Sequence, residues 1–316
     1  MTHDSTSATG PAAGEGPKPG GTGPLAGHTV SRIGYGAMQL RRLHDDRKAA
    51  IALLRRAMEL GVDHVDTAQF YGDGLVNELI REGLGGQEDV LVVTKIGCDP
   101  NPEGPFPMRP AQRPEQLRAS VEDNLRALGL EQLPVVNLRR LDRTSRLRAE
   151  GDQVVDLDDQ LAVMTAMRDE GKIGAIGLSS VTSDALRRAI PVGIACVQNE
   201  YSLLNREDED LLDMCADEGI AWIPFFPLGG AVPGTSKVTD DPAIRAAAKS
   251  LNRTPAQVGL AWLLHHAANV LLIPGTADPS HLEANLDAGT IILDTATLAA
   301  IAEAHPRPTE TALAFR

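Results

Sequence analysis

The feature that most constrains this fold is residues 64–72, HVDTAQFYG, a short apolar strand pattern that ends on a carboxylate. That carboxylate belongs to Asp66, and Tyr71 follows it five residues later. The next two apolar runs also end on a charge, on Lys95 and on Arg139. In an α/β barrel the carboxyl ends of the strands meet at one face, which carries the chemistry. A single such ending would fit a core ion pair or a strand end in solvent, but three in succession beside a tyrosine predict a shared site.

The rest of the chain alternates between apolar runs and amphipathic helical patterns. Residues 114–128 begin with a proline and are followed by Gly129, which is the usual punctuation of a helix. The strand patterns are too apolar to face water, as is typical of parallel strands that are buried on both sides. We therefore expect one α/β domain with the (β/α)8 TIM barrel fold. The expected strands cover residues 31–36, 64–66, 90–94, 135–138, 173–178, 194–197, 220–224 and 270–273. The expected helices cover residues 47–60, 114–128, 208–217, 255–265, 279–288 and 298–304, two others end near residues 85 and 170, and one begins at residue 184.

An open, doubly wound sheet is the alternative arrangement. It should carry a Gly-rich phosphate-binding turn after its first strand, and residues 33–38 do not supply one. The segment 21–23, Gly-Thr-Gly, imitates such a fingerprint, but no strand pattern precedes it and no helix pattern follows. It lies within residues 1–24, which are rich in Gly, Pro, Ser and Thr. We expect these residues to form a disordered tail ahead of a single domain over residues 25–316.

Composition excludes several classes of function. The net charge of −13 and the lack of a dense Lys/Arg run argue against a nucleic-acid partner. Cys98, Cys196 and Cys215 are scattered without C-x-x-C spacing, which indicates a reducing compartment and neither disulfides nor a zinc site. Adjacent residues on a helix point about 100° apart, so His265 and His266 are expected on the helix surface and no metal site is predicted. No apolar run reaches the roughly 18 residues of a membrane span, so we expect a cytoplasmic protein without a membrane partner.

The strand-end residues suit acid–base chemistry at a carbonyl group. Tyrosine alone is a poor acid near pH 7, but the Lys95 ammonium would stabilise the phenolate of Tyr71 and so make it a better acid. Asp66 would hold Lys95 in place, and Arg139 would add a second fixed cation. This set suits protonation of a carbonyl oxygen while hydride arrives at carbon. The structural alternative is a tyrosine packed in a core above an Asp–Lys ion pair.

Several motifs resemble the aldo-keto reductase superfamily over residues 27–304. They are GYGAM from residue 34, GVDHVDTA from residue 61, IPGT from residue 273 and HLEAN from residue 281. The resemblance implies an NADP(H)-dependent carbonyl reductase or alcohol dehydrogenase on a (β/α)8 barrel, acting on a small-molecule carbonyl substrate. It also implies a catalytic tetrad of Asp66, Tyr71 as general acid, Lys95 and the end of the fourth strand. That fourth position is usually histidine in the superfamily and is Arg139 here.

The same resemblance implies where the cofactor would bind. Phe225 stands where most members stack a tyrosine on the nicotinamide ring, and Ser180 stands where most have asparagine. Many members place Lys and Arg for the 2′-phosphate of NADP(H) where this chain has Gly275 and His281, so NADH is a possible cofactor too and Arg206 is an alternative cation. The implied cofactor-binding residues are Ser179, Ser180, Gln198, Phe225, Pro227, Leu228, Gly275, Thr276, His281 and Asn285.

Residues 134–139, 197–201 and 224–230 resemble a narrower bacterial branch that includes pyridoxal reductases, also called pyridoxine 4-dehydrogenases. This branch carries the same arginine, so pyridoxal is one expected substrate. A reductase of a specialised metabolite is the alternative, with the choice of substrate set by loops 97–113 and 142–156 and by the short tail after His305. Some barrels of the superfamily resemble channel-associated subunits that bind nucleotide as partner proteins, but the intact set of Asp, Tyr and Lys favours an enzyme. The sequence leaves the oligomeric state open.

Overall fold

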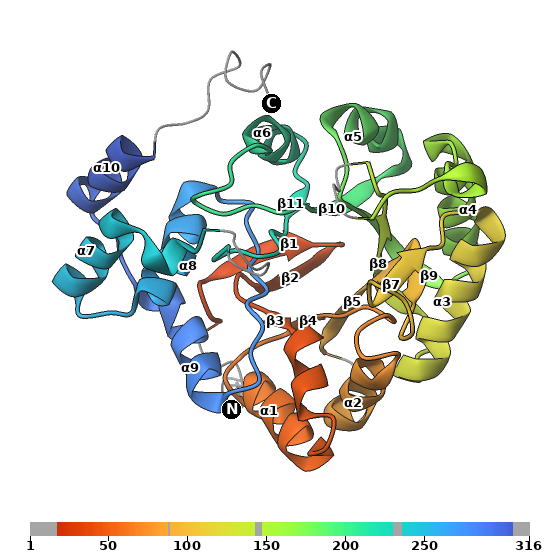
Figure 1. The fold of residues 1–316 in the computed structure, drawn as a ribbon, viewed down its shortest axis with the longest axis horizontal. Coiled ribbons are helices and arrows are strands. Elements are labelled where there is room, and N and C mark those ends of the chain that lie inside the picture. The colour runs from red at the N-terminus through yellow and green to blue at the C-terminus, as the bar shows by residue number, and fades with distance from the viewer. Residues whose placement is uncertain (1–17, 88, 143–146, 230–235, 306–316) are drawn as a thin grey trace, which may run out of the picture.

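A computed structural model describes residues 18–87, 89–142, 147–229 and 236–305 of the chain. Its centre is a seven-stranded parallel sheet with the order β11-β10-β9-β8-β5-β4-β3. Figure 1 shows these strands at the middle of the molecule, with the helices arranged around them. The strands are β3 (Tyr35–Gly36), β4 (His64–Asp66), β5 (Leu91–Ile96), β8 (Leu133–Arg139), β9 (Ile173–Ser179), β10 (Ile194–Gln198) and β11 (Ala221–Trp222).

Residues 270–272 close this sheet into a barrel. Val270 bridges to Trp222 of β11 and Leu272 bridges to Ile33 beside β3, both in parallel orientation. The N–H of Gly34 also donates to the carbonyl of Leu272 over 2.8 Å. One segment therefore joins both edges of the sheet, which confirms the (β/α)8 barrel and excludes the open sheet. The expected strand at 270–273 is present only as these bridges.

Helices cover the outside of the barrel and bury their apolar faces against the strands. The predicted helix at 114–128 is confirmed residue for residue as α3, and Gly129 ends it with a left-handed φ of 68°. No helix is predicted at α7, although its buried Ile244, Ala247 and Ala248 recur at helical spacing and Asp241 and Pro242 mark its start. The helices are α1 (Arg47–Glu59), α2 (Leu75–Leu84), α3 (Pro114–Leu128), α4 (Leu157–Asp169), α5 (Ser183–Ala189), α6 (Glu209–Asp217), α7 (Pro242–Leu251), α8 (Pro255–His266), α9 (Pro279–Asp287) and α10 (Thr295–Ala304).

An N-terminal hairpin plugs one end of the barrel. Strands β1 (Thr22–Leu25) and β2 (His28–Ser31) pair antiparallel, and Leu25 and Val30 pack into the cluster inside the barrel. The predicted boundary of the disordered tail at residue 24 is therefore wrong, because a short apolar hairpin is hidden among glycines and prolines. Lys18 is also held, by an ion pair of 2.9 Å with Asp63. The earlier part of the predicted tail, residues 1–17, lies outside the described residues.

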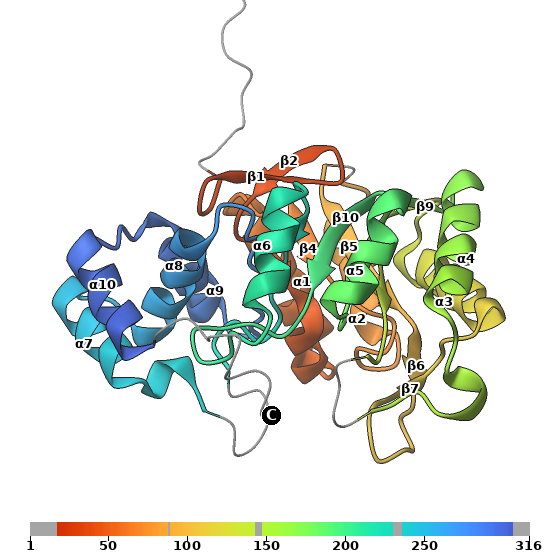
Figure 2. The same ribbon diagram turned by 90° about the horizontal axis from the view of Figure 1, so that it is seen from above.

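The opposite end of the barrel carries longer connections. The predicted loop 97–113 contains a second antiparallel hairpin, β6 (Cys98–Pro100) with β7 (Met108–Pro110). Figure 2 shows this hairpin and the β1–β2 hairpin at opposite ends of the barrel. A 3-10 helix, η1 (Ala37–Leu43), follows β3 at the same end as β6 and β7. No helix within the described ranges is long and apolar enough to cross a membrane.

The three cysteines are buried and free, and the two adjacent histidines differ in their surroundings. His265 is exposed, whereas His266 is half-buried, stacks on Trp262 at 4.5 Å and hydrogen-bonds Glu209 of α6 over 2.7 Å. Among the described residues, no group of three potential His, Cys, Asp or Glu ligands could hold a metal ion.

Candidate active site

Asp66, Lys95 and Gln198 meet inside the mouth of the barrel from three strands. Parallel strands end at the same edge, so the last inward-facing residues of β4, β5 and β10 reach one another. The Lys95 ammonium donates to Oδ1 of Asp66 over 2.5 Å, and Gln198 Nε2 donates to Oδ2 over 2.7 Å. Both Asp66 and Lys95 are at most 3% exposed. The carboxylate is thus satisfied on both oxygens and fixes the ammonium in the mouth.

Tyr71 lies against this ion pair. Lys95 Nζ is 5.3 Å from the centre of the tyrosine ring, and Phe70 supports the same ring edge-on at 5.0 Å. Burial lowers the pKa of Lys95, but the charge of Asp66 and then the interaction with Tyr71 outweigh it, so the pKa is raised overall. The structure therefore brings Asp66, Tyr71 and Lys95 together, and it keeps the lysine charged.

Arg139 completes the cluster from the end of β8. Its guanidinium carbon lies 6.0 Å from the ring centre of Phe70 and 5.8 Å from that of Phe225, so it sits between two phenyl faces. Its carbonyl accepts a hydrogen bond from Gln112 Nε2 over 2.9 Å, which anchors the strand end. Its Nε is buried without a hydrogen-bond partner in the described part of the chain. Arg139 is therefore a fixed cation with an available donor at the mouth.

Three predicted nicotinamide-binding residues line the neighbouring strand ends with unused polar atoms. The hydroxyl oxygens of Ser179 and Ser180 and the Oε1 atom of Gln198 are buried without partners among the described residues. Ser180 also adopts a left-handed φ of 57°, a conformation in which asparagine is enriched. A carboxamide carries both a donor and an acceptor, so these residues fit the amide of a nicotinamide.

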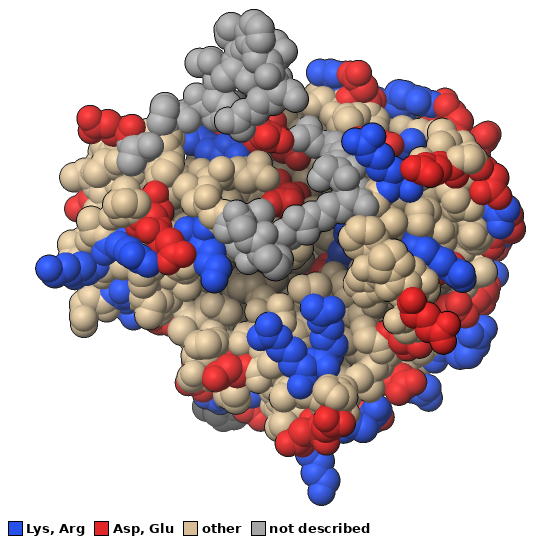
Figure 3. All heavy atoms as spheres, viewed as in Figure 1, with Lys and Arg blue, Asp and Glu red and all other residues tan. Residues whose placement is uncertain are grey.

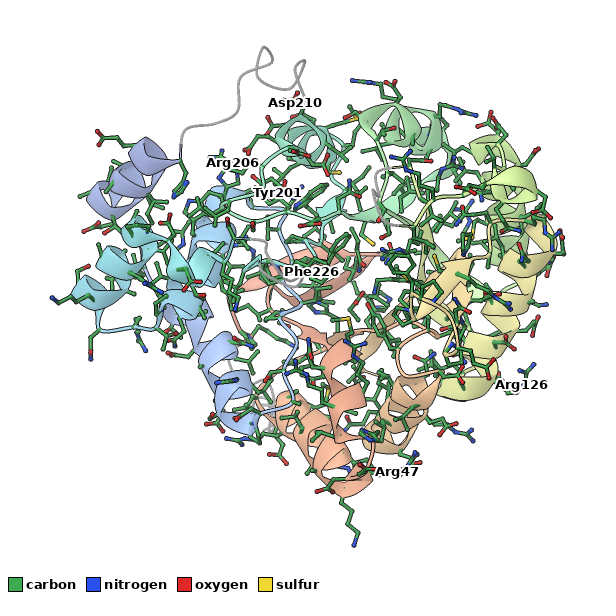
Figure 4. The ribbon with its side chains drawn as sticks, viewed as in Figure 1. Arg47, Arg126, Tyr201, Arg206, Asp210 and Phe226 are labelled. Carbon is green, nitrogen blue, oxygen red and sulfur yellow. The ribbon has the colours of Figure 1, made fainter. Side chains whose placement is uncertain are left out.

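Two phenylalanines follow β11 at the mouth. Figure 4 shows Phe226 over the centre of the barrel. It packs edge-on against Phe225 at 5.2 Å between ring centres, and its φ is 55°. Pro227 continues this turn half-buried, whereas Leu228 turns toward the helices, because a Cβ placed on Gly259 of α8 would lie 2.8 Å from its Cδ2. Phe225 and Pro227 thus stay near the mouth, and Leu228 belongs to the packing outside it.

The predicted phosphate end of the cofactor site lies at the start of α9. Tyr35 holds the carbonyl of Thr276 over 2.6 Å, and a Cβ on Gly275 would lie 2.5 Å from the carbonyl oxygen of Gly36. His281 is exposed and Asn285 is half-buried on α9. Oδ1 of Asp278 accepts the N–H of Ser280 over 2.8 Å and that of His281 over 3.4 Å. A carboxylate of the chain therefore already binds the amides that begin this helix.

Arg206, the alternative cation, is engaged elsewhere. Its Nε donates to Glu209 over 2.7 Å, and its guanidinium carbon lies 5.6 Å from the ring centre of Trp262. Figure 4 shows Arg206 next to Tyr201, near α6. Figure 3 shows acidic and basic side chains interspersed over the same face of the molecule. Arg206 is thus part of a structural ion pair and offers no free charge to a phosphate.

Comparison with known proteins identifies the family. Residues 32–306 match the model of the Aldo/keto reductase family. The chain belongs to this family. It is 42% identical to the pyridoxine 4-dehydrogenase of Escherichia coli K12 over 284 residues, which cover 88% of this chain and 96% of that protein. It is 35% identical to an uncharacterized oxidoreductase of Schizosaccharomyces pombe, covering 90% of this chain and 89% of that one.

Solved structures agree with this assignment. An aldo-keto reductase from Klebsiella pneumoniae in complex with NADPH has a TM-score of 0.77 and 25% identity, covering 92% of this chain and 96% of that one. The family predicted from the motifs is confirmed, and this aldo/keto reductase is an oxidoreductase. Sequence reasoning missed Phe70 and Phe226, which flank the mouth. The available signal was their position, since each is an aromatic residue just beyond the end of a strand.

Proposed function

We propose that this aldo/keto reductase is an NADP(H)-dependent carbonyl reductase, or alcohol dehydrogenase in reverse, in which Tyr71 is the general acid. The observation that carries the proposal is the buried Lys95 ammonium held between Asp66 and Tyr71. A cation at this place stabilises the phenolate that remains after Tyr71 gives its proton to the carbonyl oxygen. Asp66 keeps the ammonium charged and oriented. When bound, NADPH supplies the hydride to the carbonyl carbon.

Residues on three strand ends would hold the cofactor. Ser179, Ser180 and Gln198 would bind the carboxamide through their unused buried atoms, and Phe225 would support the nicotinamide ring. Gln198 also donates to Asp66, so a single amide contacts both the carboxylate and the expected place of the carboxamide. This arrangement would orient the ring against Tyr71.

Arg139 supports a flat hydroxy-aldehyde such as pyridoxal as the substrate. Its guanidinium lies between Phe70 and Phe225, so a planar ring can pack against aromatic faces while its anionic oxygen pairs with the cation. Arginine cannot deliver a proton in the working pH range, which leaves Tyr71 as the acid. The 42% identity to a pyridoxine 4-dehydrogenase supports the same class of substrate.

A panel of carbonyl compounds tests this function. NADPH oxidation should be measured with pyridoxal, benzaldehyde, 2-hydroxybenzaldehyde and an aliphatic ketone. We expect the highest kcat/KM for pyridoxal and a higher value for 2-hydroxybenzaldehyde than for benzaldehyde. Arg139→Met should lower kcat/KM for the hydroxy-aldehydes about 10-fold or more, the scale of a lost charge-assisted hydrogen bond. Arg139→His should recover part of the rate on benzaldehyde and less on the hydroxy-aldehydes.

Other outcomes select the alternatives. Turnover of benzaldehyde without a preference for hydroxy-aldehydes would indicate a reductase of a different, specialised metabolite. NADPH binding without turnover of any carbonyl would favour a nucleotide-binding partner protein. If Arg139→Met keeps both its rates and its preference, Arg139 is only a strand-end charge.

A further inference from the structure

Four buried polar side chains connect the outer faces of β4 and β5 to the helices that cover them. Thr67 Oγ1 donates to Oδ1 of Asn77 on α2 over 2.7 Å, and Thr94 Oγ1 donates to Oδ1 of Asn124 on α3 over 2.6 Å. Asn77 Nδ2 then donates to Asn124 Oδ1 over 3.0 Å. All four residues have 0% exposure. We refer to Thr67, Asn77, Thr94 and Asn124 as the amide network; Figure 1 shows α2 and α3 beside these two strands.

The amide network is fully satisfied. Asn77 Nδ2 also donates to Gln69 Oε1 over 2.7 Å, and Asn124 Nδ2 donates to the carbonyl of Ser120 over 2.8 Å. Burying four polar side chains is costly unless each finds its partners. Apolar residues fill much of the interface between helices and strands elsewhere around the barrel and could do so here. The four buried polar side chains at this interface therefore indicate a role other than packing.

The contact points of the amide network flank the three proposed catalytic residues. Thr67 directly follows Asp66, and its carbonyl accepts a hydrogen bond of 2.9 Å from Lys95 Nζ. Thr94 directly precedes Lys95 in the sequence. Gln69, the second partner of Asn77, lies two residues before Tyr71. One side chain, Asn77, thus holds both ends of the short segment between Asp66 and Tyr71.

The segment around Tyr71 has little regular structure of its own. Gly72, Asp73 and Gly74 all have left-handed φ values, of 63°, 54° and 86°. No strand or helix extends from β4 to the start of α2 at Leu75. A backbone turn holds part of this segment, since the N–H of Tyr71 donates to the carbonyl of Ala68 over 3.0 Å. The side-chain bonds of Asn77 add the link from this segment to the covering helix and so help to set the distance between the Tyr71 hydroxyl and the Lys95 ammonium. Reacting groups displaced by 1 Å can cost about 100-fold in rate.

We propose that Asn77 and Asn124 are positioning residues, which hold Tyr71, Asp66 and Lys95 at the spacing that proton transfer requires. This inference rests on the proposed function, because it takes Tyr71 as the acid. Asn77 binds the hydroxyl of Thr67, whose carbonyl accepts from Lys95, and the side chain of Gln69, which lies two residues before Tyr71. Asn124 ties Asn77 to the strand residue that precedes Lys95, so the two helices hold the ion pair and the tyrosine as one unit.

Asn77→Ala tests the proposal directly. It should lower kcat for benzaldehyde and pyridoxal about 10- to 100-fold, with kcat calculated from the concentration of protein that binds NADPH. It should leave the NADPH dissociation constant, measured by fluorescence titration, within about two-fold of wild type, because no cofactor contact is removed. The pH limit of the reduction should also move, since the distance between Tyr71 and Lys95 changes. Thr67→Val, which removes only a hydroxyl group, should give the same changes to a smaller degree.

Asn269→Ala is the matched control. Asn269 is a half-buried asparagine whose Nδ2 donates to the carbonyl of Ile220 over 3.1 Å, and it lies before residues 270–272, at the amino end of the barrel strands. This variant should lose stability without a change in kcat or pH profile. If Asn77→Ala does not fold, Thr67→Val carries the test.

The outcomes separate the two proposals. If Asn77→Ala and Thr67→Val keep wild-type kcat and pH profile and lose only thermal stability, the amide network is structural and the inference is overturned, while the proposed function stands. If wild type turns over no carbonyl compound, the proposed function fails and the inference fails with it. A selective loss of kcat with unchanged NADPH affinity supports the inference.

Discussion

Two sets of buried polar groups lie on different strands of the same barrel and differ in one respect. Outside β4 and β5, the hydroxyls and amides of the amide network bind one another with short hydrogen bonds. Inside the mouth, Arg139 Nε, the hydroxyls of Ser179 and Ser180, and Gln198 Oε1 have no partner among the described residues. Most buried polar atoms in proteins are paired. Under the proposed function, a bound cofactor or substrate supplies the missing bonds to this unpaired set.

The difference separates residues that position from residues that bind. A buried polar atom without a partner costs about 1–3 kcal/mol, and we propose that the four such atoms at the mouth recover this cost when they bind the cofactor or substrate. A network that satisfies itself has no bond left for a ligand and can only hold its surroundings. Asp66 and Lys95 belong to both descriptions, since they are paired with each other and face the mouth.

Tyr71→Phe should give the largest effect. It tests whether proton transfer can be lost without a change in either the amide network or the unpaired polar atoms of the mouth. The variant removes the proton to be transferred but no group from either set. We expect a loss of at least about 100-fold in kcat for carbonyl reduction, the scale of general acid catalysis. NADPH affinity, measured by fluorescence titration, should stay nearly unchanged. Comparable turnover in the variant would show that Tyr71 is not the acid, and a large loss of NADPH affinity would place Tyr71 among the binding residues.

Local rules were enough to predict the barrel and the ion pair in its mouth. Strands that end on Asp66 and Lys95 must bring these residues to one edge if the strands are parallel neighbours, and the register of β4 with β5 has this property. Proline at the start and Gly129 at the end were enough to bound α3. The cofactor positions came from resemblance to the family and not from local pattern.

The contacts that could not be predicted from the sequence join residues that lie far apart in the chain. Asn77 and Asn124 lie 47 residues apart and meet only because α2 and α3 pack side by side, so neither has a local signal. The same holds for Arg139, whose place between Phe70 and Phe225 depends on three different strand ends. These contacts become visible only when the barrel closes.

Removal of one hydroxyl group from each set should give the next largest effects. The free energy of unfolding should change in opposite directions in the two variants. Ser179→Ala removes a buried hydroxyl without a partner, so it should raise the free energy of unfolding of the unliganded protein by up to about 1 kcal/mol. Thr94→Val removes a hydroxyl that binds Asn124 over 2.6 Å, so it should lower this free energy by about 1 kcal/mol. Denaturant unfolding without cofactor measures both.

The affinity for NADPH should rank the two variants in the opposite order. Ser179→Ala should weaken NADPH binding several-fold, whereas Thr94→Val should leave it unchanged. If both variants destabilise the unliganded protein equally, the Ser179 hydroxyl has a partner that the comparison overlooks, such as a bound water. The distinction between binding and positioning groups would then fail at this residue.

The smallest expected effect concerns the predicted phosphate end of the cofactor site. Like the amide network, it is already hydrogen-bonded within the protein, since Asp278 accepts the N–H groups of Ser280 and His281. Hydrogen bonds from Ser280 hold the pKa of Asp278 below its usual range, so this residue keeps its negative charge at neutral pH while it caps α9. A 2′-phosphate would meet that charge, and the cation expected to face it is His281, which attracts phosphate only when it is protonated. The preference for NADPH over NADH should therefore be modest and should shrink between pH 6 and pH 8.5. Asp278→Ser keeps a capping oxygen and removes the charge, so it should raise the NADPH preference about two- to five-fold, the scale of one charge at a helix end. A strong preference that changes neither with pH nor with Asp278→Ser would require a cation other than His281.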